Sequence, residues 1–429
     1  MIIVCEPQCK GVSHEKINSG FIYGLRFAYP NEKITFFSDA SYFKNIKEIL
    51  KIGKTRINNL SHFSISFNAS KSFSIQGIFR YYFLFKKIFD KTLSFGENKI
   101  FFLSTSPIIL FAIKKLKQQE KYKNICCTFV LHGELEDIAN KEYKKPYLPS
   151  IPKTKNVLAE LIKHPGIVLL LARHILSSPF ELLSSNYSLI FKKIFRTKKM
   201  MMWRHSEQYH YISLSPHVTK NANKYLNTKY LNFNTVIMPI IFSNPLPKPK
   251  NKYIKFAVFG YGDSGQMYKM LTKLSKKKIS KPFEIKIISM DGRGTEEFQN
   301  IKHVGQGRVL TRKEMEKAAQ DIDVFINLYT KNYHSLGCSL SIFEALSYLK
   351  PILHLSNPGY NYFNKPEKPI GYRCKNLDDF VDKMYDMIQN FSRHEKQLTI
   401  FRKNMLGYRK EYNIKNNLLK LKKSFTFEE

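Results

Sequence analysis

Ser341 and Glu344 have residue types and a spacing that suit either helix capping or ligand binding. They lie in SLGCSLSIFEALSYLKPILHL, residues 335–355, at the start of a predicted helix. Their S-x-x-E spacing is that of a capping box, in which each side chain accepts a hydrogen bond from a backbone N–H of the first turn. The same geometry suits a ligand, because N–H groups at a helix start attract anions and a carboxylate one turn in can accept hydrogen bonds from sugar hydroxyls. We expect Glu344 to do both.

A glycine-rich turn in FAVFGYGDSG is the second candidate. Gly260, Gly262 and Gly265 have G-x-G-x-x-G spacing between a predicted strand and a predicted helix. Backbone N–H groups in such a turn can surround the phosphates of a dinucleotide or of a nucleoside diphosphate. A nicotinamide site needs an acidic residue about 20 residues further on, and Asp291 comes somewhat later. An NAD-dependent oxidoreductase therefore stays open as an alternative.

Further polar residues follow other predicted strands. Arg308 and Arg312 come after Gly305 in HVGQGRVLTRKEM, where guanidinium groups can bond phosphate oxygens. This arrangement favours a nucleoside diphosphate. His14 and Asn18 follow the first predicted strand in GVSHEKIN and are expected to line the ligand-binding cleft.

Short apolar strands alternate with helical segments along most of the chain, which predicts an α/β fold with parallel sheets covered by helices on both faces. The segment SNPLPKPKNK contains three prolines and is predicted to be an interdomain linker. We therefore expect two Rossmann-like, doubly wound domains that face each other across a cleft, with the ligand at the carboxyl ends of the strands. The predicted parts are an N-terminal acceptor domain (1–242), the linker (243–252), a C-terminal donor domain (253–391) and a helical extension (392–429).

Composition narrows the class of protein. With 429 residues and 43% hydrophobic content the chain can bury two cores, and its net charge of +36 implies attraction to an acidic partner such as nucleic acid, an anionic membrane or a phosphorylated substrate. The six cysteines show no zinc-binding spacing, which favours reduced thiols. The N-terminus does not resemble a signal peptide, and no apolar run approaches the roughly 18 residues of a membrane span. We expect a cytoplasmic protein, soluble or peripheral to the membrane.

The block FEALSYLKPIL, residues 343–353, and the strand and loop before it resemble the C-terminal domain of GT-B glycosyltransferases. The similarity is to the group that uses nucleotide-activated sugars to build bacterial surface polysaccharides such as lipopolysaccharide or capsule. In that family a helix opening with EAL or EAM precedes a G-K-P-V-I strand. The resemblance implies that Glu344 binds the ribose hydroxyls and that the Gly260/Gly262 loop faces the phosphates. The other residues of the expected donor site are Gly305, Arg308 and the amide-donating segment Ser339, Leu340 and Ser341.

The N-terminal half resembles the family more weakly, through its strand order and the strand end VLHGELED. His132 and Glu134 stand where members carry a histidine–glycine pair facing the donor sugar or a catalytic base. An inverting enzyme needs a base near the acceptor hydroxyl, and His132, Glu134 or Glu136 can serve. Retaining members carry a second glutamate eight residues before the first, where this chain has Leu336. The anomeric outcome therefore stays open.

Two basic, aromatic segments, YYFLFKKIFDK (81–91) and SLIFKKIFRTKKMMMWRH (188–205), suit helices that lie on an anionic membrane, or amphipathic helices with a solvated basic flank. We interpret the protein as a glycosyltransferase that uses a nucleotide diphosphate sugar and a glycan acceptor, lipid-linked, at the cytoplasmic face of the membrane. Helix amides and arginines can neutralise the leaving diphosphate, so no metal or other cofactor is expected. The alternatives are the oxidoreductase, a nucleic-acid binder without a recognisable motif, which we do not favour, and a catalytically inactive glycosyltransferase-like binding protein.

Overall fold

The computed structural model describes residues 1–11, 14–54, 59–65, 75–133, 135–139, 196–259, 264–288, 295, 298–305, 310–329, 336–337 and 339–426. Four predicted site residues, Glu134, Gly260, Gly262 and Arg308, lie outside the described residues. The same holds for residues 188–195 of the second basic segment.

The first sheet has seven strands in the order β3-β2-β1-β4-β5-β6-β7, and neighbouring strands pair in parallel. Its strands are β1 (Ile2–Cys5), β2 (Ile34–Ser38), β3 (Leu60–Ser64), β4 (Lys99–Phe102), β5 (Cys126–Leu131), β6 (Tyr209–Ser213) and β7 (Asn232–Thr235). Side chains of β1 alternate between two apolar clusters, with Ile2 and Val4 on one face and Ile3 and Cys5 on the other. A strand that is apolar on both faces requires cover on both faces, which its helices provide.

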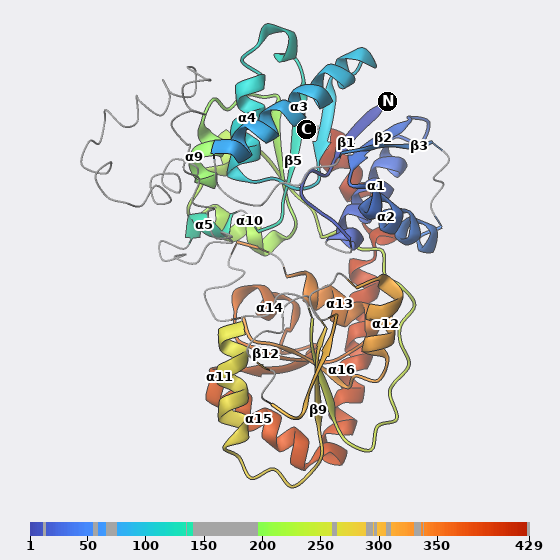
Figure 1. The fold of residues 1–429 in the computed structure, drawn as a ribbon, viewed down its shortest axis with the longest axis vertical. Coiled ribbons are helices and arrows are strands. Elements are labelled where there is room, and N and C mark those ends of the chain that lie inside the picture. Colours follow the sequence, from blue (N-terminus) through green and yellow to red (C-terminus); the bar gives the residue numbers. More distant parts are fainter. Residues whose placement is uncertain are drawn as a thin grey trace, which may run out of the picture.

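Helices cover the two faces of this sheet in separate groups (Figure 1). On one face α1 (Glu15–Ala28) packs against α2 (Ala40–Ile52), whose start is capped by the Asp39 carboxylate. On the other face α4 (Pro107–Leu116) packs between α3 (Ile75–Ser94) and α9 (Thr197–Met202). The shorter helices are η1 (Glu120–Tyr122), α5 (Glu136–Ala139), α10 (Pro216–Ala222) and η3 (Thr228–Tyr230).

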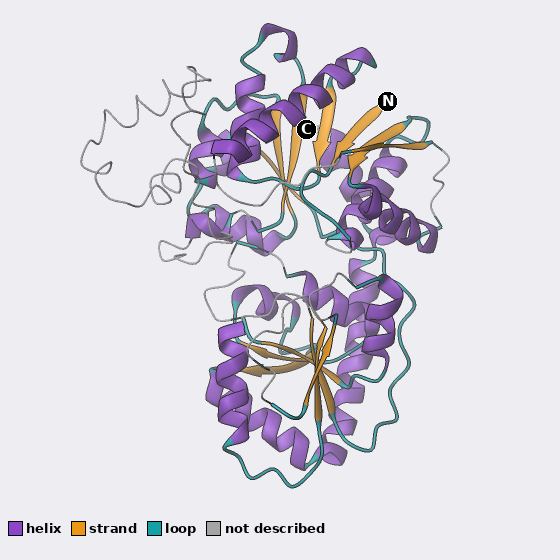
Figure 2. Ribbon diagram, viewed as in Figure 1, coloured by secondary structure: helices purple, strands orange, loops and turns teal. Residues whose placement is uncertain are grey.

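The second sheet has six strands in the order β10-β9-β8-β11-β12-β13, again parallel (Figure 2). Its strands are β8 (Lys255–Phe259), β9 (Glu284–Ile288), β10 (Ile301–Val304), β11 (Val324–Asn327), β12 (Ile352–Leu355) and β13 (Gly371–Cys374). The surrounding helices are α11 (Ser264–Ser275), α12 (Arg312–Gln320), α13 (Leu340–Tyr348), α14 (Pro358–Phe363), α15 (Leu377–Gln389) and α16 (Phe391–Tyr412). Both strand orders are doubly wound, which confirms the predicted fold class.

The chain passes between the two sheets at two places. Residues 243–252 form the first crossing and contain neither helix nor strand. After α16, which packs on the second domain, η4 (Ile414–Asn416) leads to α17 (Leu418–Thr426), which packs on α1 of the first domain. Gly24 permits this approach, because a Cβ atom there would lie 2.2 Å from a methyl carbon of Leu421. The C-terminal segment therefore belongs to both domains.

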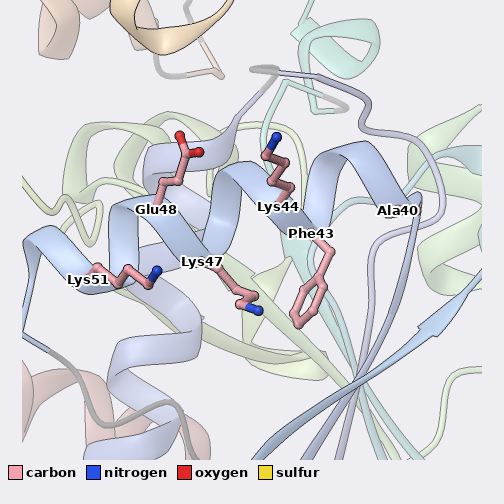
Figure 3. Close-up of a pocket in the computed structure, with 6 residues that line it drawn as sticks. All are labelled: Ala40, Phe43, Lys44, Lys47, Glu48 and Lys51. Atoms are coloured by element: carbon pink, nitrogen blue, oxygen red, sulfur yellow. The ribbon is translucent and has the colours of Figure 1, made fainter.

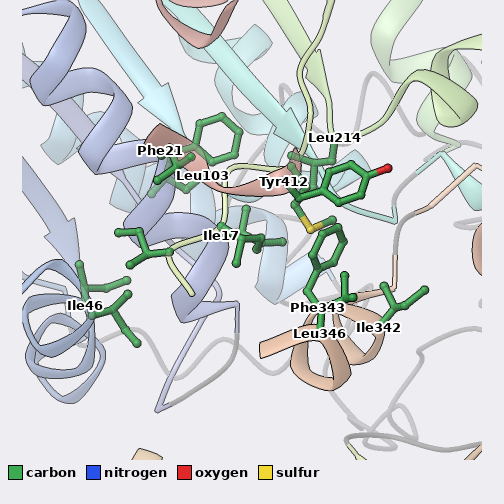
Figure 4. Close-up of a cluster of buried hydrophobic side chains, with 14 of the residues drawn as sticks. Ile17, Phe21, Ile46, Leu103, Leu214, Ile342, Phe343, Leu346 and Tyr412 are labelled. Carbon is green, nitrogen blue, oxygen red and sulfur yellow. The ribbon is translucent and has the colours of Figure 1, made fainter. Parts of the chain in front are cut away.

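The two domains also share an apolar cluster (Figure 4). Ile17 and Leu214 of the first domain lie in this cluster with Ile342, Phe343 and Leu346 of α13. Within the described residues, no helix combines the length and the apolar character needed to cross a bilayer.

Candidate functional site

The carboxyl edges of the two sheets meet, and the residues just beyond the strand ends form the contact. From the first domain these are the start of α1 after β1, the segment around α5 after β5, and α10 after β6. From the second domain they are the start of α12 after β10 and the segment leading from β11 into α13. Ligands of doubly wound sheets bind at this edge. The candidate site is therefore built from residues of both domains.

The start of α13 differs from the predicted capping box. The helix begins at Leu340 with Ser339 as its N-cap, and Ser339 makes no side-chain capping hydrogen bond. A box at this position would need its glutamate at Ile342, so Ser341 and Glu344 lie too far into the helix to form one. The predicted cap role of Glu344 is wrong, because the helix begins earlier than the S-x-x-E pattern indicates.

Hydroxyl groups gather at the same helix start. The Oγ atoms of Ser339 and Ser341 are 2.7 Å apart, both contact the hydroxyl of Tyr360, and the Asn327 amide donates to Ser341 Oγ at 3.4 Å. The Ser339 side chain does not cap the first-turn amides, which include that of Leu340, and the helix dipole makes this end positive. The helix start can therefore accept an anion such as a phosphate group.

Glu344 lies one turn further along α13 and belongs to a four-residue charge cluster. Lys16 Nζ donates to its carboxylate at 2.5 Å, and Arg312 Nη1 lies 3.8 Å from its other oxygen. Glu15 completes the group by accepting from Arg312 Nη1 at 3.3 Å. We call these four residues, Glu15, Lys16, Arg312 and Glu344, the interdomain charge cluster. Each domain contributes one basic and one acidic side chain to the cluster.

Burial and mutual attraction oppose each other in this cluster. Burial raises the pKa of Glu15 to about 7, although Arg312 acts in the opposite direction. Burial and the charge of Arg312 lower the pKa of Lys16 to about 8. Burial alone would raise the pKa of Glu344, but Lys16 and Arg312 together hold it below its usual value. Glu344 is therefore ionised at neutral pH and retains two acceptor oxygens.

Arg312 does not face an open phosphate site, contrary to the expectation that it would bond phosphate oxygens. It is the first residue of α12, its side chain is 7% exposed, and its remaining guanidinium nitrogens donate to Glu316 and to the Ser243 hydroxyl at 3.0 Å each. Gly305 directly follows β10 with φ of 109°, a conformation that favours glycine. Arg312 thus joins the cluster to the first interdomain crossing.

His132 and His14 lie together at the carboxyl edge of the first sheet. Their rings stack with centroids 4.4 Å apart, and His132 Nε2 donates to the carbonyl oxygen of Leu103 at 2.6 Å. Burial lowers the pKa of His132 to about 4. A base is most effective when its pKa lies near the working pH. These properties favour a positioning role for His132 over that of a general base.

Asn18 does not line the interface as predicted. Its side chain is fully buried within the first domain and donates to Glu6 and to the Tyr42 hydroxyl, at 2.7 Å each. The amide therefore ties the loop after β1 to the start of α2, and we assign it no ligand contact.

A second interdomain contact holds the backbone that leads into α13. Glu136 accepts a hydrogen bond from Leu336 N at 2.7 Å, and His217 Nε2 donates to the carbonyl oxygen of Gly337 at 3.3 Å. The His217 ring is oriented by the Ser215 hydroxyl, 2.7 Å from its Nδ1 atom. The Leu336 side chain is buried in an apolar cluster of the first domain. We call this contact the backbone clasp, defined by Glu136, His217, Leu336 and Gly337.

Sequence reasoning missed Glu15, Lys16 and His217 as interface residues, although GVSHEKIN contains the first two. No local pattern marks them, because each partner lies at least 120 residues away. Within the described residues, no group of three or more His, Cys, Asp or Glu side chains is placed to hold a metal ion. The absence of a metal requirement stays a prediction.

A pocket on the surface of α2 is unrelated to this interface (Figure 3). All of its lining residues come from that one helix: Ala40, Phe43, Lys44, Lys47, Glu48 and Lys51. None of them contributes to the charge cluster or to the backbone clasp.

Comparison with known proteins gives matches in structure and none in sequence. No protein-family model and no curated protein sequence matches the chain. A glycosyltransferase from Rickettsia africae ESF-5 superposes with a TM-score of 0.52 at 11% identity, covering 100% of this chain and 99% of its own. An Escherichia coli structure described as "Trehalose-6-phosphate", bound with UDP-2-fluoro glucose, gives 0.53 at 12% identity and covers 98% and 99%.

The lipopolysaccharide outer core galactosyltransferase WaaB, without ligand, gives a TM-score of 0.50 at 12% identity and covers 97% of this chain and 98% of its own. All three similarities extend over both domains and the connection between them. At 11–12% sequence identity they support a shared fold and no shared activity. Together with the two doubly wound sheets in contact at their carboxyl edges, they show that this chain has the GT-B fold of glycosyltransferases.

Proposed function

We propose that this protein is a glycosyltransferase that moves a sugar from a nucleotide diphosphate sugar to a glycan acceptor. The observation that carries the proposal is the position of α13: its uncapped N-terminus and ionised glutamate lie where the two domains of a GT-B fold meet. The fold alone does not assign an activity. The chemistry of this helix start adds the anion-binding and hydroxyl-binding groups that a nucleotide sugar requires.

In this proposal the donor is held by the second domain. The first-turn amides of α13, at Ser339, Leu340 and Ser341, receive the diphosphate, and Glu344 accepts hydrogen bonds from the ribose hydroxyls. Gly260, Gly262, Gly305 and Arg308 complete the proposed donor site on the evidence of the sequence. Diphosphate is the leaving group, and fixed amide dipoles stabilise the charge that develops on it during transfer.

The proposed catalytic groups come from the first domain. If the reaction inverts the anomeric centre, a base near the acceptor hydroxyl is required. Glu134 is our choice for that base, because His132 has a pKa near 4 and Glu136 accepts the amide hydrogen of Leu336. His132 and His14 then position the acceptor end of the site. No resident cofactor is part of this proposal.

The acceptor is proposed to be lipid-linked and presented at the cytoplasmic face of an anionic membrane. The basic segments on α3 and α9 support this, because both helices pack against α4 on one face of the first sheet (Figure 1). Phe83 on α3 and Met202 on α9 are exposed. The exposed basic side chains on these two helices are Arg80, Lys87, Lys91, Lys198 and Lys199. Each basic residue near an anionic surface contributes about 1 kcal/mol. The WaaB match is compatible with a role in surface polysaccharide synthesis.

Nucleotide binding tests the donor site. We would titrate UDP, GDP, CMP and NAD into the full chain by calorimetry, with Glu344→Gln as the variant and Glu316→Gln as the control. Glu316 is a second carboxylate bonded to Arg312, but it lies outside the proposed site. The proposal expects UDP or GDP to bind and Glu344→Gln alone to weaken binding. Binding of NAD only would favour the oxidoreductase, and no nucleotide binding would exclude the proposed donor site.

Sedimentation with lipid vesicles tests the membrane face. We expect the chain to bind phosphatidylglycerol vesicles and not phosphatidylcholine vesicles, and Lys198→Glu with Lys199→Glu to reduce that binding. The matched control is Lys47→Glu with Lys51→Glu, which reverses two exposed charges on α2. An equal loss in both double variants would show a general effect of charge and contradict a specific face.

A further inference from the structure

The carboxylate proposed to bind ribose already has an internal partner. Lys16 Nζ lies 2.5 Å from Glu344 Oε2 and 2.9 Å from the hydroxyl of Ser347, one turn further along α13. The Lys16 side chain is only 2% exposed and lies over the Tyr348 ring, 4.9 Å from its centroid. The first turn of α1 therefore fixes an ammonium group on Glu344 from across the domain interface.

An ammonium group and sugar hydroxyls compete for a carboxylate, because both donate hydrogen bonds to its oxygens. The second oxygen of Glu344, Oε1, has the Arg312 guanidinium 3.8 Å away, beyond hydrogen-bond distance, so it can accept a hydroxyl while Lys16 still occupies Oε2. The Lys16–Glu344 hydrogen bond joins two ionised groups, whereas a ribose hydroxyl would bring no charge of its own. Ribose cannot use both oxygens of Glu344 while Lys16 remains where it is.

We propose that Lys16 is a residue of the donor site: its ammonium group occupies the Glu344 carboxylate in the nucleotide-free protein, and the ribose of the donor displaces it. This inference rests on the proposed function. Displacement does not dissolve the whole contact, because Glu15 and Arg312 form a separate pair within the charge cluster. Lys16 belongs to the first domain, so its release weakens the interface at the moment the second domain takes up its nucleotide.

The inference predicts that removing the ammonium group tightens nucleotide binding. A ligand that must first displace an internal occupant binds with an apparent affinity reduced by the fraction of sites that are vacant. If about nine sites in ten are occupied by Lys16, the Lys16→Met variant should bind the nucleotide about tenfold more tightly. Ser347→Ala, which removes only the second acceptor of Lys16, should shift the affinity in the same direction by a smaller factor.

A double-mutant cycle separates this role from a merely structural one. Dissociation constants for the nucleotide that binds best would be measured by calorimetry for the wild type, Lys16→Met, Glu344→Gln and the double variant. Lys16 acts through Glu344, so Lys16→Met should change the affinity little in the Glu344→Gln background. Lys114→Met is the matched control, because Lys114 is an equally buried lysine of the first domain that bonds backbone carbonyl oxygens. It should lower the melting temperature without changing nucleotide affinity.

The possible outcomes are distinct. Tighter binding in Lys16→Met that disappears when Glu344 is also replaced supports the inference, and so does tighter binding in Ser347→Ala if Lys16→Met does not fold. Equal affinity in the wild type and Lys16→Met overturns the inference and leaves the proposed function standing. Weaker binding in Lys16→Met makes Lys16 an ordinary ligand of the nucleotide and also overturns it. No nucleotide binding by any variant refutes the proposed function, and this inference with it.

Discussion

Two neighbouring helices, α12 and α13, begin with the same local pattern and use it differently. Thr311-x-x-Glu314 forms a complete capping box at α12, with the threonine hydroxyl and the glutamate carboxylate each bonded to a backbone N–H. Ser341-x-x-Glu344 forms none, because α13 begins at Leu340. One glutamate is used by its own helix, and the other is left for a partner from a different domain. The pattern alone does not decide between a cap and an interaction site.

The largest expected difference between the two helices is in stability. Glu344→Gln removes the negative partner of a buried ion pair and leaves Lys16 uncompensated, which should lower the free energy of unfolding by about 3 kcal/mol. Glu314→Gln keeps an exposed capping oxygen and should cost less than about 0.5 kcal/mol. Urea denaturation of both variants measures the difference. Equal losses would contradict a stabilising role for the Lys16–Glu344 ion pair.

The charge cluster should also make the α13 contact depend on pH through Glu15. Its pKa is raised from 4.5 to about 7 by burial, so the protonated form favours folding. The stability it contributes is fully present below pH 4.5 and is lost as the pH rises towards 7. Between pH 5 and 7, Glu15→Gln should therefore gain on the order of 2 kcal/mol relative to the wild type. A difference that does not change with pH would contradict this electrostatic description.

A smaller effect is expected at the α12 cap. Thr311→Ala removes the hydroxyl that bonds Glu314 N and should cost about 1 kcal/mol of stability. Nucleotide affinity should not change, because the box has no contact with the proposed donor site. Thr311→Ser, which keeps a capping hydroxyl, is the control and should restore most of the loss. A change in affinity in Thr311→Ala would mean that the two helix starts are coupled.

The smallest effect is expected for Ser341→Ala. Ser341 is inside α13 and does not cap it, and Ser339 Oγ, 3.2 Å from the Tyr360 hydroxyl, offers Tyr360 a second partner. The cost should be about 0.5 kcal/mol, the lower end of the range for a single hydrogen bond. Thermal denaturation beside Thr311→Ala measures it. A loss larger than that of Thr311→Ala would reverse the comparison.

The sheets could be predicted from the sequence because their central strands are short apolar runs between helical segments. The exceptions have physical reasons. β3 is the polar segment LSHFS at a sheet edge, where its side chains are half-buried or exposed, and β13 is the short segment GYRC at the edge of the second sheet. The apolar segment NTVIMPIIF, residues 234–242, suits a longer strand than the structure has: β7 ends at Thr235, and the apolar residues beyond it pack in the shared cluster.

The site was less predictable than the fold. The capping box at α12 has a local signal, T-x-x-E, which could have found it. The pairing of Lys16 with Glu344 spans 328 positions, and a single sequence carries no information on such a contact. Glu344 was identified because its neighbours form a family-like block, whereas Lys16 was missed because its partner lies in the other domain.

The two crossings between the domains determine how they can move relative to each other. A single flexible connection would allow the domains to turn about any axis. Here the second crossing lies beside the first: Ile240 forms a β-bridge with Asn413, and Arg409 donates to the carbonyl oxygen of Ser243 at 2.7 Å. Two adjacent connections restrict the relative rotation of the domains more than one connection would. Rotation about the line that joins them is therefore the easiest motion, and it would open or close the carboxyl edges that carry the charge cluster and the backbone clasp.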